Sequence, residues 1–207
     1  MNHKIQDEEL PSHPATGQTK AFDHLAFERA TDLLREEHRV IERVLAVVDK
    51  LVRVPVETSL ESWKKALDFI RHFADKCHHL KEETILFPCM EAHGMPREGG
   101  PIGVMLMEHE EGRGYVSSMV AAMTLIEAKN EAAKETLLSN AQAYSHLLRE
   151  HIEKEDEILF RIAADVIPED EQKQLLHTFE EHEAREMGTR VHEKYLAIAQ
   201  ELEASVT

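Results

Sequence analysis

Helix-breaking residues divide this chain into a few long segments. Gly and Pro are scarce, at 8 and 7 of 207 residues, whereas Glu, Ala, Leu, Lys, Arg and Met are abundant. Breakers stand at Pro55, in the stretch "HGMPREGGP" that ends at Pro101, and at Pro168. Proline removes a helical hydrogen bond and glycine is a poor helix former, so helices are expected to end or begin at these places. The pattern predicts an all-α fold.

The segments between the breakers predict five helices. They cover about 22–52, 59–91, 101–129, 131–166, and a stretch from Pro168 towards the C-terminus. Short connections between long helices favour an antiparallel up-down arrangement. We therefore expect a flexible tail in residues 1–20, an antiparallel up-down four-helix bundle in residues 21–167, and a fifth C-terminal helix in residues 168–207 packed on the bundle.

Charge and hydropathy exclude several classes of protein. A formal charge of -16 disfavours partners that are nucleic acids or anionic membrane surfaces. No apolar run approaches the roughly 20 residues of a membrane span, and the first residues lack the apolar core of a signal peptide. We expect a cytoplasmic protein. Cys77 and Cys89 lie twelve residues apart. On one helix they would be about 18 Å apart, so reduced thiols are expected.

One ten-residue segment recurs along the chain without gaps. "HHLKEETILF", which begins at His78, aligns with "HIEKEDEILF", which begins at His151. The alignment matches Glu82 with Glu155 and places His79 opposite an isoleucine. The repeat therefore indicates that His78 and Glu82, and not His79 and Glu83, correspond in function to His151 and Glu155.

Histidine followed by glutamate four residues later is a frequent spacing in this sequence. Such residues are neighbours on a helix, so each pair could bind one metal ion or could be a solvated pair on an acidic surface. The remainder of the helical face separates these two interpretations. The histidines with this spacing are His24, His38, His78, His79, His146, His151, His177 and His182.

The two overlapping pairs at the start of the repeat lie on different faces. The face of His78 also carries Leu67, Ala74, Ile85 and Leu86. The face of His79 carries Asp68, His72, Asp75 and Lys76. On a regular α-helix, His78 and Glu82 should therefore point into the core, and His79 and Glu83 towards water.

The other long helices each place one histidine on an apolar face. His151 and Glu155 share the cleanest apolar stripe of the chain with Tyr144. His38 and His109 also lie on apolar faces. We therefore expect His38, His109, His151 and Glu155 to be buried.

Two further pairs are less suited to a metal site. His146 and Glu150 fall on a polar face and are expected at the surface. His182 and Glu186 lie at the edge of the apolar stripe of the last helix, where a structural role is favoured over a metal role.

Six core-facing groups should thus meet inside one bundle. A lone core histidine usually makes only a hydrogen bond, but a buried ionised carboxylate without a partner costs several kcal/mol. Two dications would satisfy all six groups at once. Imidazole nitrogen and carboxylate oxygen suit iron, manganese or zinc. The predicted metal ligands are His38, His78, Glu82, His109, His151 and Glu155.

These motifs resemble the hemerythrin-like family, also called HHE cation-binding domains. The matching pieces are "LLREEHRVIERVL" around His38, "HHLKEETILFP" from His78, "EHEEGR" around His109 and "LLREHIEKEDEILF" around His151. The resemblance covers about residues 25–165.

The resemblance implies a centre of two iron ions in a four-helix bundle. His38 and His78 would bind one iron, and His109 and His151 the other. Glu82 and Glu155 would bridge the two ions, with an oxo or hydroxo group completing the bridge.

Two departures from the oxygen-carrying hemerythrins stand out. Those proteins carry His-x-x-x-His on the third helix, where this chain has Arg113, and His-x-x-x-x-Asp on the fourth, where the spacing here is shorter and ends in Glu155. One histidine ligand is missing unless Tyr144 or another group replaces it; a core tyrosine is the favoured interpretation of that residue. Fewer ligands leave more open coordination, which favours reactivity over reversible oxygen carriage.

Two functional hypotheses remain. The first is a non-haem di-iron protein that binds or reduces a small oxidant, namely dioxygen, peroxide or nitric oxide. The alternative is a non-catalytic iron- or oxygen-responsive sensor or binding module acting through a separate partner. Residues 1–25 contain no cysteine, which argues against the iron–sulfur repair role known in this family. A metal-free structural bundle is disfavoured by the buried carboxylates.

Overall fold

The computed structural model describes residues 27–188 and 190–206, and within these ranges the regular structure is entirely helical. None of the described helices is long and apolar enough to cross a membrane. The α-helices are α1 (Ala30–Leu51), α2 (Leu60–Phe69), α3 (Phe87–Ala92), α4 (Pro101–Glu127), α5 (Ala133–Lys154), α6 (Phe160–Val166), α7 (Glu169–Glu186) and α8 (Val191–Ser205). A 3-10 turn, η2 (Val56–Thr58), precedes α2, and the π-helical segments are η3 (Ile70–His79), η4 (Glu82–Leu86) and η5 (Glu155–Leu159).

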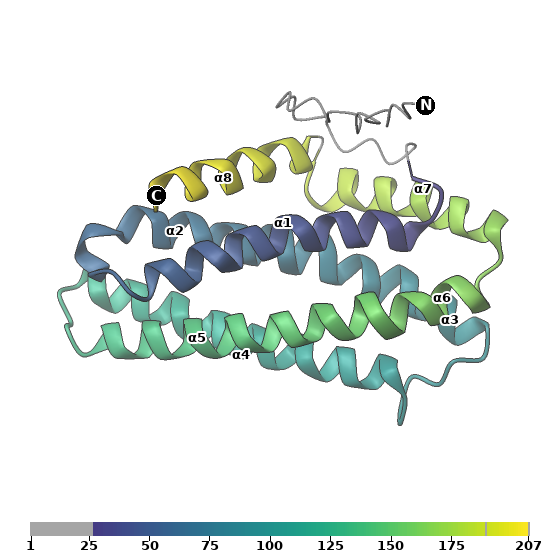
Figure 1. The fold of residues 1–207 in the computed structure, drawn as a ribbon, viewed down its shortest axis with the longest axis horizontal. Coiled ribbons are helices and arrows are strands. Elements are labelled where there is room, and N and C mark those ends of the chain that lie inside the picture. The colour runs from purple at the N-terminus through teal and green to yellow at the C-terminus, as the bar shows by residue number, and fades with distance from the viewer. Residues whose placement is uncertain (1–26, 189, 207) are drawn as a thin grey trace, which may run out of the picture.

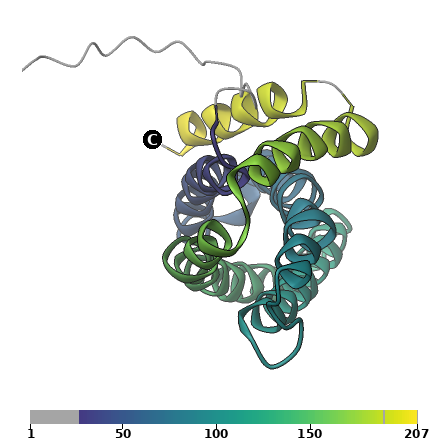
Figure 2. The same cartoon turned by 90° about the vertical axis from the view of Figure 1, so that its right-hand side faces the viewer.

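These helices pack into a helical bundle, and within it the described chain forms four long continuous rods. The first rod is α1, the second is the unbroken run α2–η3–η4–α3, the third is α4, and the fourth is the unbroken run α5–η5–α6. Figure 1 shows the rods side by side along the longest axis. The view along that axis in Figure 2 shows them around a common interior, with α7 and α8 outside. Both outer helices contact the first two rods.

The breakers in the sequence act where they were predicted to act. Pro101 occupies the first turn of α4, and α7 begins directly after Pro168. Gly94 follows α3 with φ 92°, a conformation that glycine adopts without a steric penalty. The predicted helical class and most helix boundaries are therefore confirmed.

Two expected helices differ from the structure. The expected fifth helix is two helices, because Gly188 and Arg190 have φ of 82° and 69° and cannot continue a right-handed helix. The first helix, expected from about residue 22, begins at Ala30, and residues 27–29 precede it without helical structure. The tail predicted for residues 1–20 lies outside the described residues.

The hydrophobic core consists of two apolar clusters, and a layer of buried polar groups separates them along every rod. One apolar cluster includes Val44, Trp63, Met119 and Leu137. The other includes Leu33, Phe87 and Phe160, and is covered by residues of α7, whereas α8 contributes to the first. Buried polar residues occur between the two clusters in each rod, and this intermediate layer contains all six predicted ligands.

Candidate metal centre

The structure brings the six predicted ligands into one buried group. Each residue is at most 2% exposed. Their nitrogen and oxygen atoms form two sets, each with its ligand atoms within 4.8 Å of one another. Both sets contain Glu82 and Glu155, so the two carboxylates are shared. The first half is His38 and His78 with these glutamates, and the second half is His109 and His151 with the same glutamates.

The two shared carboxylates each face a histidine in both halves. Oε2 of Glu155 lies 3.1 Å from Nε2 of His38 and 3.3 Å from Nε2 of His151. Glu82 uses one oxygen for each half. Its Oε1 lies 3.6 Å from Nε2 of His78, and its Oε2 lies 3.6 Å from Nε2 of His109.

Several atoms in this group have no hydrogen-bond partner although they are buried. These are both carboxylate oxygens of Glu82 and of Glu155, and Nε2 of His38 and His78. Buried polar atoms are normally satisfied, and leaving a charged one unsatisfied is costly. A cation between these nitrogen and oxygen atoms would satisfy them, and the donor set suits iron.

His109 and His151 give a second indication of a cation. Their Nε2 atoms lie 3.0 Å apart. The Nδ1 of each ring is hydrogen-bonded to a carboxylate, at 2.7 Å to Glu83 and at 3.0 Å to Glu108. An ionised carboxylate only accepts, so each Nδ1 carries the proton in the neutral ring and each Nε2 presents a lone pair. Two facing lone pairs repel unless a cation lies between them.

A ring of carboxylates supports the four histidines, and sequence reasoning missed it. Each rod supplies a carboxylate that accepts from Nδ1 of the histidine on the next rod, and the fourth rod supports the first. Such partners fix the tautomer and orientation of a ligating histidine. The pairs are Glu37 with His78 at 2.8 Å, Glu83 with His109 at 2.7 Å, Glu108 with His151 at 3.0 Å, and Asp156 with His38 at 2.8 Å.

The sequence contains a signal for this ring. Each supporting carboxylate is adjacent in the chain to a predicted ligand of its own helix, as Glu37 is to His38 and Glu83 is to Glu82. The support nevertheless acts on a histidine of another rod. Helical faces within one segment therefore could not reveal it.

A cation lies behind each supporting carboxylate. Arg113, which replaces a histidine of the oxygen carriers, donates to Glu83 at 2.7 Å. Burial raises the pKa of the Glu83 carboxyl, but hydrogen bonds from His109 and Arg113 outweigh it and hold the pKa below its usual value. The other cations are Lys81 behind Glu37, Lys154 behind Glu108, and Arg39 with Arg35 near Asp156.

The expectation that His79 points towards water is wrong. Its side chain is buried, its ring stacks on that of His109 with centroids 4.0 Å apart, and it forms a possible ligand group with His109 and His151. The reason is the π-helical segment η3, in which hydrogen bonds run to the fifth residue instead of the fourth. This widened turn changes the angle between successive side chains, so both His78 and His79 reach the interior.

Glu83 was also expected to point towards water on a regular helix, and this expectation is wrong. Its side chain is 16% exposed and binds Nδ1 of His109, so it is not directed into solvent. It is absent from the possible metal-ligand groups of the described residues.

The remaining sequence predictions have mixed outcomes. His146 and Glu150 are exposed, as predicted. His182 is buried but is absent from the possible ligand groups of the described chain. Tyr144 is buried in the core and is likewise absent from those groups. The two cysteines, Cys77 and Cys89, are free thiols.

Burial keeps several imidazoles of the centre neutral. Burial lowers the pKa of His78 to about 4, although its hydrogen bond to Glu37 opposes this. It lowers the pKa of His109 to about 3, assisted by His79. Burial next to Glu155 raises the pKa of Glu82 well above its usual value. Metal ligands must be deprotonated, so His78 and His109 are ready for binding at neutral pH, whereas Glu82 would release its proton as a metal binds.

A cavity reaches the second half of the site. It has a volume of about 390 Å³, and His79, His109 and His151 are among the residues that line it. Its walls are largely apolar, with Val116 and Leu148 among the lining residues. A small molecule could therefore approach this half from outside.

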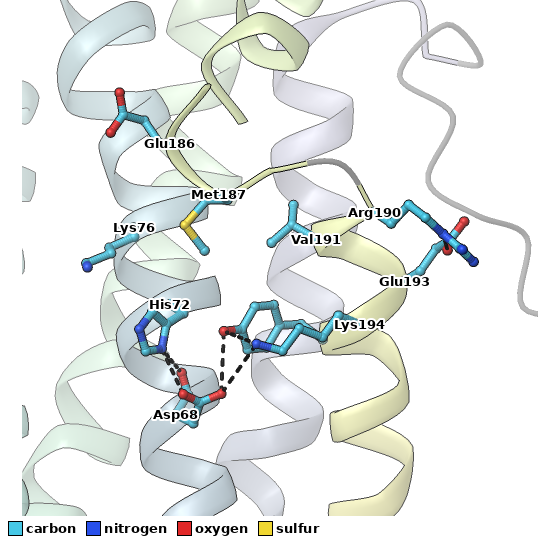
Figure 3. A pocket seen from close by; sticks show the side chains of 10 residues that line it. Asp68, His72, Lys76, Glu186, Met187, Arg190, Val191, Glu193 and Lys194 are labelled. Carbon is cyan, nitrogen blue, oxygen red and sulfur yellow. Dashed lines mark hydrogen bonds and ion pairs between the residues drawn. The ribbon is translucent and has the colours of Figure 1, made fainter. Parts of the chain in front are cut away.

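A second hollow lies away from the centre, between the second rod and the start of α8 (Figure 3). Its volume is about 730 Å³, and its lining carries charges of both signs, including Asp68, Lys76, Glu186 and Lys194. His72 is hydrogen-bonded there rather than left without a partner. This hollow lacks the convergent ligand groups of the centre among the described residues.

Comparison with known proteins agrees with the motifs and the buried site. Residues 29–163 match the model of the hemerythrin HHE cation-binding domain. The uncharacterized proteins Mb2018 of Mycobacterium bovis and Rv1995 of Mycobacterium tuberculosis are each 28% identical over 160 residues, which is 76% of this chain and 62% of theirs. The chain thus spans less than two thirds of those relatives, and no solved structure matches it significantly. The family match covers most of the chain, which belongs to the hemerythrin HHE cation-binding domain family.

Proposed function

We propose that this protein holds two iron ions inside an antiparallel up-down four-helix bundle. His38 and His78 would bind one ion, His109 and His151 the other, and Glu82 and Glu155 would bind both. The observation that carries the proposal is the set of buried carboxylate oxygens without hydrogen-bond partners between facing histidines. Manganese or zinc would satisfy the same atoms, and metal analysis distinguishes them.

The reaction that suits this centre is the binding or reduction of a small oxidant: dioxygen, peroxide or nitric oxide. Iron would supply electrons and open coordination positions to the oxidant. The chain supplies the approach, because the apolar cavity leads to His79, His109 and His151. The supporting carboxylates hold the Nδ1 protons away from the ions, so that the Nε2 atoms remain available as ligands.

The proposal includes a cytoplasmic location. Two thiols that remain unpaired, Cys77 and Cys89, are typical of a reducing compartment.

The first test is metal content. Protein purified without chelators, or reconstituted anaerobically with ferrous iron, should contain about two ions per chain, one for each of the two ligand sets. Replacing both Glu82 and Glu155 with alanine should abolish uptake, while His146→Ala on the exposed surface should leave it unchanged. No uptake of iron by the wild-type protein would refute the proposal.

The second test is turnover. The ferrous protein should be oxidised by peroxide, dioxygen or nitric oxide, and the rate should be measurable by stopped-flow absorption. Full iron loading with no reaction towards any of the three would favour the alternative of a non-catalytic iron-responsive module.

A further inference from the structure

A buried charge network lies behind one of the four supporting carboxylates. Glu37, which accepts from Nδ1 of His78, also accepts from Nζ of Lys81 and, at 2.7 Å, from Nε2 of His192. Nζ of Lys81 lies 2.5 Å from Oε1 of Glu183, and Nδ1 of His192 lies 3.0 Å from Oε2 of the same residue. Glu37, Lys81, Glu183 and His192 are each at most 5% exposed.

This network does not call for a metal ion of its own. Glu37, Cys77, Glu183 and His192 offer ligand atoms within 4.8 Å of one another, but the ammonium group of Lys81 already bridges the two carboxylates. Burial and the neighbouring Glu183 and Glu37 act in opposite senses on His192, and the carboxylates prevail, raising its pKa. Two carboxylates thus face two cationic side chains. Glu82 and Glu155, by contrast, face one another with unsatisfied oxygens.

The network joins the metal centre to α7 and α8. Glu183 belongs to α7 and His192 to α8, and both lie beyond residues 29–163, which match the family model. The cations behind all four supporting carboxylates come from the rods, but those behind the other three carboxylates are partly exposed. Side-chain exposures are 49% for Arg39, 28% for Arg113 and 35% for Lys154, against 0% for Lys81.

Independent contacts hold α8 against the rods. Asp68 of α2 pairs with Lys194 and accepts a hydrogen bond from the hydroxyl of Tyr195 at 3.4 Å (Figure 3). Arg43 of α1 forms two hydrogen bonds with Glu203, at 2.8 and 2.6 Å. These contacts all lie on the C-terminal side of His192 along α8, the first of them two residues away. The position of His192 is therefore determined by more than its own hydrogen bonds.

We propose that α7 and α8 complete the metal centre by fixing His78. Glu183 and His192 act as positioning residues: together with Lys81 they hold Glu37 where it accepts the Nδ1 proton, which aims Nε2 of His78 at the first half of the centre. This inference rests on the proposed metal centre and adds to it a part that lies outside the family's matched region. Loss of a hydrogen-bonding partner of this kind typically lowers metal affinity about 10–100-fold.

A matched pair of substitutions at position 192 tests the proposal. His192→Gln places an amide nitrogen near the former Nε2, so it retains a donor to Glu37. His192→Asn places one near the former Nδ1, so it retains only the contact with Glu183. The affinities of metal-free protein for its two ferrous ions are measured anaerobically by competition with a chromophoric chelator. His192→Asn should lower the affinity for one of the two ions about 10–100-fold and leave the affinity for the other unchanged. His192→Gln should retain much of the wild-type affinity for both.

Two controls separate positioning from general destabilisation. Leu196→Ala removes apolar contacts of α8 without touching the network, so it should lower the unfolding free energy and leave both affinities unchanged. In a His78→Ala background, where Glu37 has no ligand to orient, His192→Asn should have no further effect on affinity.

The outcomes distinguish failure of the inference from failure of the proposed function. A wild-type protein that binds no iron would overturn the metal centre itself. Two ions bound with unchanged affinity in His192→Asn, or an equal loss in Leu196→Ala, would overturn only the positioning role. An effect of His192→Asn that persists without His78 would also do so.

Discussion

The two halves of the metal centre share a plan but differ in their surroundings. In both, the phenylalanine of one repeated segment stacks on a histidine of another rod: Phe160 on His38 with centroids 5.4 Å apart, and Phe87 on His109 with centroids 6.1 Å apart. Both halves use the same two glutamates. The first half is backed by buried charges and by α7 and α8, whereas the second faces a cavity.

One position of the repeat shows how the halves diverge. His79 aligns with Ile152, and both residues are buried. The second half therefore has a third imidazole beside it, which also lines the cavity. For the proposed centre this comparison implies a division of work, in which the first half would retain its ion and the second half would meet the small molecule.

The largest effect should come from the carboxylates that both halves share. Glu82→Gln or Glu155→Gln should lose both ions together, with affinity falling by more than the roughly 100-fold typical of a supporting residue. The metal-free Glu82 variant should be more stable than wild type by about 1–3 kcal/mol, since a buried ionisable group without a partner is removed. Iron analysis and denaturant unfolding measure the two effects, with the exposed Glu150→Gln as control. Retention of one tightly bound ion would show that the halves are independent.

A change at position 79 should affect only the second half. His79→Ile copies the residue found at the matching position 152. The affinity for one ion should fall about tenfold, because an imidazole beside His109 is lost, and the other ion should be unaffected. Chelator competition measures both affinities, and His146→Ile provides a control at an exposed histidine. Equal weakening of both ions would contradict the assignment of His79 to the second half.

Narrowing the cavity should slow the reaction without removing iron. A Cβ at Gly112 would lie 3.6 Å from Cε2 of Tyr144, an ordinary contact, so a larger side chain there would intrude into the cavity. Gly112→Val should lower the rate of oxidation by peroxide roughly two- to tenfold if the cavity is the approach route. Gly114→Val on the same helix meets nothing within 4 Å of its Cβ and controls for the change in helix propensity. Equal rates for both variants would exclude this route.

The last effect is confined to acid pH and concerns the stability of the metal-free protein. Burial lowers the pKa of His79 to about 4, while the unfolded chain titrates near 6.5. Between these values the unfolded state binds more protons, so the stabilising effect of neutral His79 is present above pH 6.5 and is lost as pH falls towards 4. His79→Ile should therefore make the pH dependence of unfolding free energy shallower by up to about 1.4 kcal/mol per pH unit in this window. Unfolding curves from pH 4 to 7 measure the slope, and an unchanged slope would mean that His79 titrates normally.

Helical faces located the buried groups in the regular helices, whereas in the π-helical segments they placed His78, Glu82 and Glu155 correctly but His79 wrongly. His38 and His109 lie in α-helix, and the 100° rule placed both inside. His79 lies at the end of a ten-residue π-helical segment, which no spacing of apolar residues announced. Asp68 and Lys76 share a face with His79 only on a regular α-helix, and they therefore indicated a solvent-exposed side chain. This segment is not an α-helix, so that inference does not apply. The ligand role of the six residues stays a prediction.

The sequence by itself determined the helical class, the breaks between the rods and the six buried histidines and glutamates, because these depend on local propensity and on periodicity within one segment. Only the tertiary structure decided which partner each group has. Glu37 supports His78 on the neighbouring rod, and His192 reaches Glu37 from more than 150 residues away in the chain. Such contacts depend on how rods of similar pattern pack against one another. The sequence therefore reveals that a charged group is buried, but it does not reveal which residue neutralises the charge.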